Sequence, residues 1–513
     1  MSCGPLAVSR LQLPSTLASQ RTARTYATTT HQFPGRAKLE NHDFTKARRP
    51  KKEGTIADVF VQLISEAPPL PERFSDLKKE LFTEKLVHSW KEVLSELEIV
   101  TEEVAVKGGD VLPRVAYSDV VRGLSKEQVD DIKRVGAVVI KGGVPVEEAL
   151  AWKQQIREYV AANQDKVKGR GMRIPPDKIV FYELYNSKAQ IAARTHPALI
   201  NSQKALLKLW HSSDPETAVS LATPISYFDR LRICDPGPSI FTLGPHIDGG
   251  SLERWEDPGF RSCFQKILSG RWKEHDSFDM SPRLNANQDL YHAPNQCSIF
   301  RPWQGWTSLS TTGARQGTLQ LLPFLSLATA YIMLRPFFRL RPDRKHTNGT
   351  AIPLEADAWE VNLDGTEFPG SMMGKAQQMN EETHPHLRLD KALVSLPEIQ
   401  PGDQVYWHCD LVHAVERKHS GKSDSSVLYI PAVPLTLKNA AYLRDQRETF
   451  IEGLPSPDFP GGEGETSFIG RSTLQDVQTA EGRRVLGLEP FDIPAETTPA
   501  SAKLIKQANS ILF

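Results

Sequence analysis

The chain has 513 residues, with 62 basic and 62 acidic residues and a formal net charge of zero. This balance argues against nucleic acid as the main partner, since nucleic-acid-binding domains usually carry a basic excess. The five cysteines include no CxxC pair, which argues against a disulfide framework and a zinc ribbon. A chain of this length can hold one large catalytic domain with helical additions, or two modest domains.

The first 39 residues differ in composition from the rest. No acidic residue precedes Glu40, whereas arginines are spread among many serines and threonines. Such a start is typical of a mitochondrial transit peptide, and the sequence Arg-Thr-Tyr-Ala at 24–27 resembles a processing site. We therefore expect import into the mitochondrial matrix. If the segment is only a disordered tail, the expected location is the cytoplasm.

The next part of the chain is expected to be mainly helical. Residues 40–60 are basic and lead into the fold, and apolar residues recur at near-helical spacing from 71 to 104. Ser125 and the glutamine three positions later form a capping box that predicts a helix start. A short strand is expected at 137–140, and a further helix after Pro145.

From about residue 225 the pattern changes to short β-branched and aromatic runs between turns. Many short strands favour a jelly roll over a parallel β-α-β sheet. The most apolar stretch, 319–340, contains a proline and two arginines, so we expect a buried strand and helix there and no membrane span. The expected strands are 227–233, 240–243, 298–308, 318–322, 393–396, 404–408 and 426–430.

Two segments carry candidate metal ligands. In Gly-Pro-His-Ile-Asp-Gly-Gly, residues 244–250, His246 and Asp248 are two apart at a strand end, so both side chains face the same way. A Pro-Gly-Asp turn at 401–403 begins a second strand segment, and His413 lies at its far end. Two histidines and one carboxylate form a facial triad that suits Fe(II) and leaves coordination positions open.

These segments carry a family resemblance. The order HxD, long insertion, Trp306-Thr-Ser-Leu, Gly317-Thr-Leu-Gln-Leu-Leu-Pro and Pro-Gly-Asp…His resembles the phytanoyl-CoA hydroxylase group of 2-oxoglutarate dioxygenases. The strings at 244–255, 407–415 and 429–434 resemble the YbiU-like family, a largely uncharacterised domain-of-unknown-function family of bacteria and fungi. The resemblance spans roughly residues 120–455.

The resemblance implies a fold, a reaction and a cofactor set. The fold would be α+β: a double-stranded β-helix (a jelly-roll, cupin-like barrel) with a helical N-terminal region and helical insertions. Fe(II) would bind His246, Asp248 and His413, with 2-oxoglutarate and O₂ as cosubstrates for hydroxylating or otherwise oxidising an unidentified small molecule. Two alternatives stay open: a metal enzyme of cupin type that does not use 2-oxoglutarate, and a non-catalytic barrel scaffold.

Other histidines offer rival ligand sets. His408 and Asp410 form a second HxD, and His384 with His386 forms an HxH. In the family pattern the last histidine of the strand, His413, binds the metal, and the earlier one packs in the barrel. The HxH pair has no matching carboxylate, and the cysteine at 409 is expected to be a packed thiol.

The expected cosubstrate arginine is missing from its usual strand. Most members of the superfamily place an arginine about ten residues after the distal histidine, where it pairs with the far carboxylate of 2-oxoglutarate. Here strand 426–430 has no arginine, and Arg417 and Lys422 fall in the turn before it. The substitutes are Arg230, Arg232 and Arg301, and Trp306 is a further candidate for the cosubstrate pocket. A run with Tyr182, Tyr185, Gln190 and Arg194 is expected to pack on the barrel.

The resulting organisation has four parts. Residues 1–39 are the transit peptide, 40–220 a helical region on the barrel, 221–455 the jelly-roll oxygenase core with insertions, and 456–513 a C-terminal extension. The expected partner is a small-molecule substrate, with no nucleic acid and no membrane, and the sequence leaves the oligomeric state open.

Overall fold

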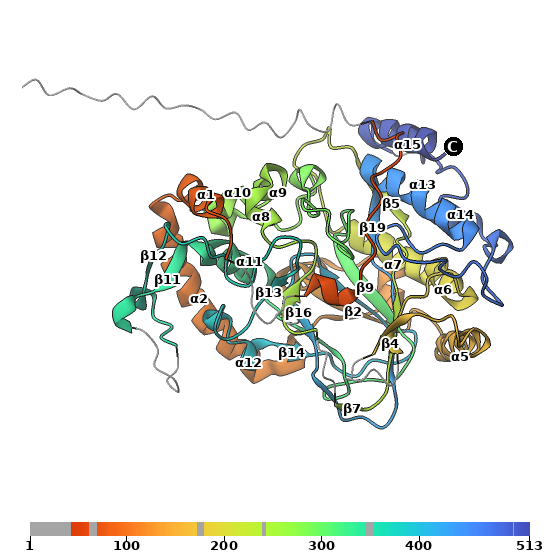
Figure 1. Ribbon diagram of the computed structural model, residues 1–513, viewed down its shortest axis with the longest axis horizontal. Coiled ribbons are helices and arrows are strands. Elements are labelled where there is room, and N and C mark those ends of the chain that lie inside the picture. Colours follow the sequence, from red (N-terminus) through yellow and green to blue (C-terminus); the bar gives the residue numbers. More distant parts are fainter. Residues whose placement is uncertain (1–42, 61–68, 172–178, 239–242, 345–351, 496) are drawn as a thin grey trace, which may run out of the picture.

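The computed structural model describes residues 43–60, 69–171, 179–238, 243–344, 352–495 and 497–513. The predicted transit peptide at 1–39 lies outside the described residues, as does most of the predicted strand at 240–243. The described chain forms several sheets with helices packed around them (Figure 1). None of the described helices is long and apolar enough to cross a membrane.

The largest sheet has eight strands and runs through the centre of the molecule (Figure 1). All neighbouring pairs are antiparallel except the first two strands, which are parallel. In sheet order the strands are β1 (Arg114–Ala116), β2 (Ala137–Lys141), β15 (Gln404–His408), β9 (Trp303–Ser308), β18 (Ser425–Tyr429), β6 (Leu231–Cys234), β4 (Ile179–Tyr182) and β3 (Gly169–Gly171).

A second, antiparallel sheet of five short strands faces the first across a cavity. In sheet order its strands are β13 (Gln377–Gln378), β8 (His246–Ile247), β16 (His413–Val415), β10 (Leu319–Leu321) and β14 (Val394–Ser395). Three two-stranded sheets flank these, pairing β11 (Phe338–Leu340) with β12 (Trp359–Val361), β17 (Lys418–His419) with β7 (Gly237–Pro238), and β19 (Val433–Thr436) with β5 (Val219–Ile225). The protein is thus a mixed helix-and-strand protein with several sheets, which in the described part of the chain do not close into a barrel.

The N-terminal region is helical, as predicted. The run at 71–104 divides into two helices with a short break between them, and the capping box at Ser125 starts the helix expected there. The predicted strand at 137–140 is β2, and a helix follows Pro145 as expected. The helices are α1 (Arg73–Leu81), α2 (Lys85–Lys107), α3 (Tyr117–Arg122), α4 (Lys126–Val135), α5 (Val146–Ala162), α6 (Lys188–Arg194) and α7 (Pro197–Leu207).

Shorter helices occupy the insertions, and longer ones close the C-terminal end. The apolar stretch at 319–340 contains β10 and a buried helix, as predicted. The C-terminal helices pack together in a buried apolar cluster. The helices are α8 (Glu253–Glu256), α9 (Pro258–Ser262), α10 (Gln265–Leu268), α11 (Leu325–Leu334), α12 (Leu389–Ala392), α13 (Leu437–Glu452), α14 (Ala480–Val485) and α15 (Pro499–Leu512).

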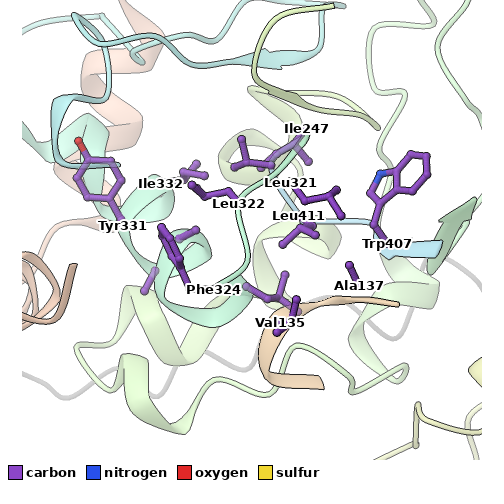
Figure 2. Close-up of a cluster of buried hydrophobic side chains, with 14 of the residues drawn as sticks. Val135, Ala137, Ile247, Leu321, Leu322, Phe324, Tyr331, Ile332, Trp407 and Leu411 are labelled. Atoms are coloured by element: carbon purple, nitrogen blue, oxygen red, sulfur yellow. The ribbon is translucent and has the colours of Figure 1, made fainter. Parts of the chain in front are cut away.

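One buried apolar cluster connects the two large sheets to the helices. Figure 2 shows Ala137 of β2 and Trp407 of β15 beside Ile247 of β8, with Val135 and Tyr331 contributed by helices. β2 and β15 are buried along nearly their whole length, so their apolar residues, Ala137–Ile140 and Val405–Trp407, are consecutive rather than alternating. This packing fixes the position of β8, the strand that carries His246.

The turn before β15 is built by Pro-Gly-Asp, residues 401–403. Gly402 has φ +86°, and a Cβ there would lie 2.1 Å from the carbonyl oxygen of Val144. The carboxylate of Asp403 accepts hydrogen bonds from the backbone N–H groups of Gln400 and Gly142, at 2.8 and 2.9 Å. This turn fixes the start of β15, whose bounds match the predicted strand at 404–408.

Residues 43–60, here called the N-terminal strap, cross the surface and end at the cavity. Figure 1 shows them in red, passing from near α15 to the centre of the molecule. The ammonium of Lys51 is buried, and it donates to the carbonyls of Ala293 and Gln296 at 2.9 and 2.7 Å and pairs with Asp289 at 2.6 Å. The strap ends in a 3₁₀ turn at Ile56–Val59, next to the second sheet.

Candidate metal centre

Three of the predicted ligands meet at one end of the second sheet. His246 of β8 lies opposite His413 of β16 in the strand register, and Asp248 follows directly after β8. Asp248 Oδ1 lies 3.5 Å from His246 Nε2, and Asp248 Oδ2 lies 3.8 Å from His413 Nε2. One donor atom from each residue lies within 4.8 Å of the other two. The geometry thus brings together the HxD and the distal histidine.

Both imidazoles are held in the same manner. His246 Nδ1 lies 2.6 Å from the carbonyl oxygen of Gly244, and His413 Nδ1 lies 3.0 Å from that of Leu411. A carbonyl only accepts hydrogen bonds, so each Nδ1 carries the proton and each Nε2 presents its lone pair. Ligating histidines in metal sites are typically oriented by such a bond from the other ring nitrogen.

Burial keeps His413 in the form that binds metals. Burial lowers the pKa of His413 to about 3, and the neighbouring His246 acts in the same direction. The His413 imidazole is therefore neutral at physiological pH, as metal binding requires. The ring of Phe60, from the strap, packs edge-on against His246 with centroids 4.9 Å apart, so an aromatic ring shields the ligand from water.

Asp248 is the most accessible of the three ligands, with 29% of its side chain exposed. Burial alone would raise the pKa of its carboxyl, but His246, His413 and two nearby arginines more than offset this, and the pKa is lowered. Gly249 and Gly250 follow with φ of +79° and +83°. These angles turn the chain away from the second sheet and leave the carboxylate facing the two histidines.

The three ligands open into a cavity of about 120 Å³ between the two large sheets. The first sheet contributes Gln304, Trp306 and Trp407 to its wall, and the second contributes Leu319 beside the ligands. The other lining side chains include Ile56, Val59, Phe60, Asp229, Arg230, Arg232, Asn295, Arg301, Thr318, Ser425, Tyr429 and Phe459.

Arg232 and Trp306 line this cavity from inside the first sheet. Arg232 is 4% exposed, and it donates from Nη1 to the carbonyl of Gly317 at 3.2 Å and to the hydroxyl of Ser425 at 3.3 Å. Its Nε is buried and has no hydrogen-bond partner in the described part of the chain. Arg232 lies opposite Val427 of β18 in the strand register. It is therefore next to the strand on which the cosubstrate-binding arginine of the superfamily was expected.

Arg230 and Arg301 line the same cavity on either side of Asp229. Arg230 Nε lies 3.3 Å from Asp229 Oδ1, and Arg301 Nη1 lies 3.5 Å from Asp229 Oδ2. Burial alone would lower the pKa of Arg301, but the surrounding acidic groups raise it, so the guanidinium stays charged. All four residues predicted for the cosubstrate pocket therefore reach the cavity, in two separate groups.

The second HxD is a structural element. His408 Nε2 donates to the carbonyl of Ser277 at 2.9 Å, and its Nδ1 accepts from the backbone N–H of Asp410 at 3.0 Å, so both ring nitrogens are engaged. The Asp410 carboxylate pairs with Arg283 and lies 3.9 Å from Arg254. Although these residues lie close enough to hold a metal, His408 has no free lone pair, and burial raises the pKa of the thiol of Cys409.

The HxH pair is also part of the core. His386 Nδ1 lies 3.0 Å from the hydroxyl of Tyr331, and its Nε2 lies 3.1 Å from the carbonyl of Leu354. His384 Nδ1 lies 2.9 Å from the hydroxyl of Thr383. Both histidines are buried against aromatic rings of α2 and α11, so neither faces the cavity.

The remaining candidates lie away from the metal ligands. Arg417 and Lys422 are exposed in the turn before β18. Arg194 is buried and donates to the backbone carbonyls of Tyr185 and Asp229, and Gln190 caps α6. Among the described residues, the run with Tyr182, Tyr185, Gln190 and Arg194 does not line the cavity. Only Gln190 and Arg194 lie on a helix, α6, whereas Tyr182 ends strand β4 of the first sheet.

Several lining residues carry no clear signal in the sequence. Trp407 of β15 packs against His413, with ring centroids 5.2 Å apart, and its Nε1 is buried without a partner among the described residues. In the sequence it belongs to the segment 407–415, which carries the family resemblance but no sign of a role in the cavity. Phe60 and Phe459 come from segments far from the ligands in sequence, and no local pattern marks them.

Comparison with known proteins identifies the family. Residues 68–488 match a family model described as Gig2-like. A protein of Escherichia coli K12, the uncharacterised YbiU, is 33% identical over 391 residues, which cover 75% of this chain and 87% of YbiU. The predicted resemblance to YbiU is therefore confirmed.

Two solved structures are similar over most of their length. The GlcNAc inducible gene 2 protein of Candida albicans is 31% identical with a TM-score of 0.77, covering 87% of this chain and 96% of that one. A Salmonella typhimurium protein, provisionally named an oxidoreductase, is 29% identical with a TM-score of 0.68, covering 82% of this chain and 98% of that one. On these matches the chain belongs to the Gig2-like family.

Proposed function

We propose that the protein is an Fe(II)- and 2-oxoglutarate-dependent dioxygenase that oxidises a small molecule. The observation that carries the proposal is the set of His246, Asp248 and His413 at the edge of an enclosed cavity, with both Nε2 lone pairs directed by Nδ1 hydrogen bonds. Two imidazoles and one carboxylate with open positions are the ligands of non-haem Fe(II) oxygenases. The provisional name of the Salmonella relative agrees with an oxidoreductase.

The spacing of the donor atoms fits one ion. Donors in adjacent positions of one ion, with bonds of about 2.0–2.2 Å, lie roughly 3 Å apart. Asp248 lies 3.5 Å from His246 and 3.8 Å from His413, so small shifts of the side chains would bring the donors onto one ion. The absence of cysteine among these three ligands favours iron over a structural zinc site. The donor set therefore fits Fe(II) without rearrangement of the strands.

The order of the strands supports a jelly-roll core. Along the chain, β6, β9, β15 and β18 belong to the first sheet, whereas β8, β10, β14 and β16 belong to the second, so the chain crosses repeatedly between them. Such crossing between two facing antiparallel sheets is the pattern of double-sheet jelly rolls. We infer that the two sheets are the halves of a double-stranded β-helix with the ligands at one open end.

The cavity supplies binding groups for 2-oxoglutarate. The guanidinium of Arg232 and the hydroxyl of Ser425 would bind the far carboxylate of 2-oxoglutarate. The two groups lie side by side, and the Nε of the charged Arg232 has no partner among the described residues. The unpartnered Nε1 of Trp407 lies near His413 and would donate to an oxygen of the bound ligand. When bound, Fe(II) and 2-oxoglutarate supply oxidising chemistry that couples conversion of 2-oxoglutarate into succinate and CO₂ to oxidation of a substrate.

The protein's own contribution is to position the ligands and exclude water. Trp306 and Trp407 form one wall, and the strap closes the other with Val59 and Phe60. A site partly shut off from solvent strengthens the electrostatic contacts made inside it and protects reactive species from water. The site thus suits an oxidation whose reactive species must be protected from water.

The test is succinate formation by purified protein loaded anaerobically with Fe(II) and then given 2-oxoglutarate and O₂. We expect turnover that depends on Fe(II) and is lost in His246→Gln, while His88→Gln, on an exposed helix face, behaves as the unmodified protein. Metal binding without 2-oxoglutarate binding would overturn the proposal in favour of a metal enzyme with another cosubstrate.

A further inference from the structure

The cavity holds more positive charge than iron and 2-oxoglutarate need. Three arginines and two aspartates are the acidic and basic residues that line it among the described residues, giving one net positive charge. A divalent ion and dianionic 2-oxoglutarate would cancel each other and leave that charge in place. Since an uncompensated charge in an enclosed site is costly, a further anion would complete the balance.

The uncompensated charge is located at Arg230 and Arg301. Arg232 lies beside Ser425 and is assigned to 2-oxoglutarate, whereas Arg230 and Arg301 share one carboxylate, that of Asp229. Two guanidiniums on one carboxylate leave a net positive charge at this point. The pair therefore forms a second anion-binding position, separate from Arg232.

The donors of this pair are largely unused. A guanidinium has five N–H donors, yet Arg301 makes a single hydrogen bond in the described part of the chain, from Nη1 to Asp229 at 3.5 Å. Arg230 uses two donors, one on Asp229 and one on the amide oxygen of Asn295 at 3.2 Å. The unused donors are available to a bound carboxylate, which guanidinium recognises with two parallel hydrogen bonds.

The two guanidiniums are held in place by aromatic rings. Arg230 lies over the ring of Phe459, at 4.2 Å, and Arg301 over that of Tyr227, at 5.0 Å. The hydroxyl of Tyr227 donates to Asp458 at 2.9 Å, which fixes the second ring. Arginines stacked in this way lose little conformational entropy when they bind a ligand, so the position is prepared for an anion.

The pair lies close to the metal ligands. Both arginines line the cavity into which His246, Asp248 and His413 open. An anion on Arg230 and Arg301 would therefore hold the group attached to it in the same cavity as the metal.

We propose that Arg230 and Arg301 bind a carboxylate of the substrate, so that the substrate is a small carboxylic acid. Its body would lie against the apolar side chains of Ile56, Val59 and Phe60 of the strap, which line the same cavity. The paired guanidiniums and their unused donors are geometric observations, whereas the charge balance and the statement that the acid is oxidised rest on the proposed function.

The test measures binding to protein loaded with Fe(II) and 2-oxoglutarate without O₂, by calorimetry. The probes are a series of straight-chain monocarboxylates and the primary amide of each. We expect at least one carboxylate to bind roughly tenfold or more tightly than its amide, and Arg301→Met and Arg230→Met to weaken it roughly 10- to 100-fold. Each single replacement leaves Asp229 paired with the other arginine, so both variants should fold.

The control is Arg339→Met, which removes an arginine that pairs with Glu360 on the surface. Equal binding of acids and amides, no binding of any acid, or wild-type affinity in Arg301→Met would each overturn the proposal. So would loss of 2-oxoglutarate binding in Arg301→Met, because the pair would then hold the cosubstrate. Acid binding without succinate formation would instead refute the proposed function and leave the anion position intact.

Discussion

His413 lies directly opposite His246 in the pairing of β16 with β8, and each imidazole makes its Nδ1 hydrogen bond to the carbonyl two residues before it. The backbone that forms the sheet thus also sets the tautomer of both rings. No additional side chain is needed to orient them. The ligand geometry is therefore a property of the strand register, and it persists as long as the two short strands stay paired.

Replacing either histidine should abolish metal binding and the stability it brings. A metal at about 100 times its dissociation constant stabilises the folded state by about 2.7 kcal/mol. We expect this gain on adding Fe(II) or Co(II) to the unmodified protein and to His88→Gln, and no gain in His413→Gln. Thermal unfolding with and without metal measures it, and an undiminished gain in His413→Gln would place the metal elsewhere.

Arg232→Met should weaken 2-oxoglutarate specifically. Losing a charge-assisted hydrogen bond costs about 1.5–3 kcal/mol, so we expect KM for 2-oxoglutarate to rise roughly 10- to 100-fold with metal content unchanged. Ser425→Ala, which removes the neighbouring hydroxyl, should have a smaller effect in the same direction. Steady-state kinetics at saturating O₂ would decide, and an unchanged KM in Arg232→Met would rule out this anchor.

Part of the candidate ligand set was predictable because its geometry is local. Two residues at i and i+2 in one strand share a face whatever the rest of the fold does, so His246 and Asp248 needed only a correct strand end. His413 was preferred to His408 on the family resemblance, whereas β15 matched its prediction because Gly402 and Asp403 fix where it begins.

The cationic residues were harder because their roles depend on long-range packing. Arg230 and Arg232 are two apart and looked equivalent, yet one shares Asp229 with Arg301 and the other lies beside β18 through its strand register. The strap residue Phe60 reaches His246 from a segment far away in sequence. No periodicity encodes such contacts, since they arise only when distant segments pack together.

Asp410→Asn should destabilise the fold without affecting metal binding. Asp410 is buried against the guanidiniums of Arg283 and Arg254, and removing one partner of a buried ion pair costs about 3–5 kcal/mol because the other charge stays buried. Chemical denaturation would measure the loss, and metal analysis at a temperature where the variant is folded would follow binding. Loss of metal from folded Asp410→Asn would make the second HxD a ligand set.

Lys51→Met should release the N-terminal strap. The ammonium of Lys51 is buried against Asp289 and two carbonyls, so its loss leaves a buried carboxylate unpaired. We expect faster limited proteolysis within residues 43–60 and little change elsewhere, because local segments can open independently of the core. Lys46→Met is the matched control, since Lys46 is exposed. Equal protection in both variants would show that the strap is held by other contacts.

Glu253→Gln should change the pH dependence of stability. Burial raises the pKa of the Glu253 carboxyl to about 8 from an ordinary value of 4.5, although the backbone N–H of Ser251 donates to it at 2.6 Å. Between these two pH values the folded state keeps a proton that the unfolded state has released. Stability therefore falls as pH rises through this window, by roughly 5 kcal/mol at about 1.4 kcal/mol per pKa unit.

Glutamine is neutral at every pH, so Glu253→Gln removes this loss. The variant should match the unmodified protein near about pH 5 and become progressively more stable than it toward about pH 9, measured as the difference in denaturation midpoint at each pH. Glu274→Gln is the control: Glu274 is exposed and its pKa is lowered, chiefly by a hydrogen bond from Lys266, so no gain at high pH is expected. A constant difference across the range for Glu253→Gln would mean that Glu253 ionises normally in the folded protein.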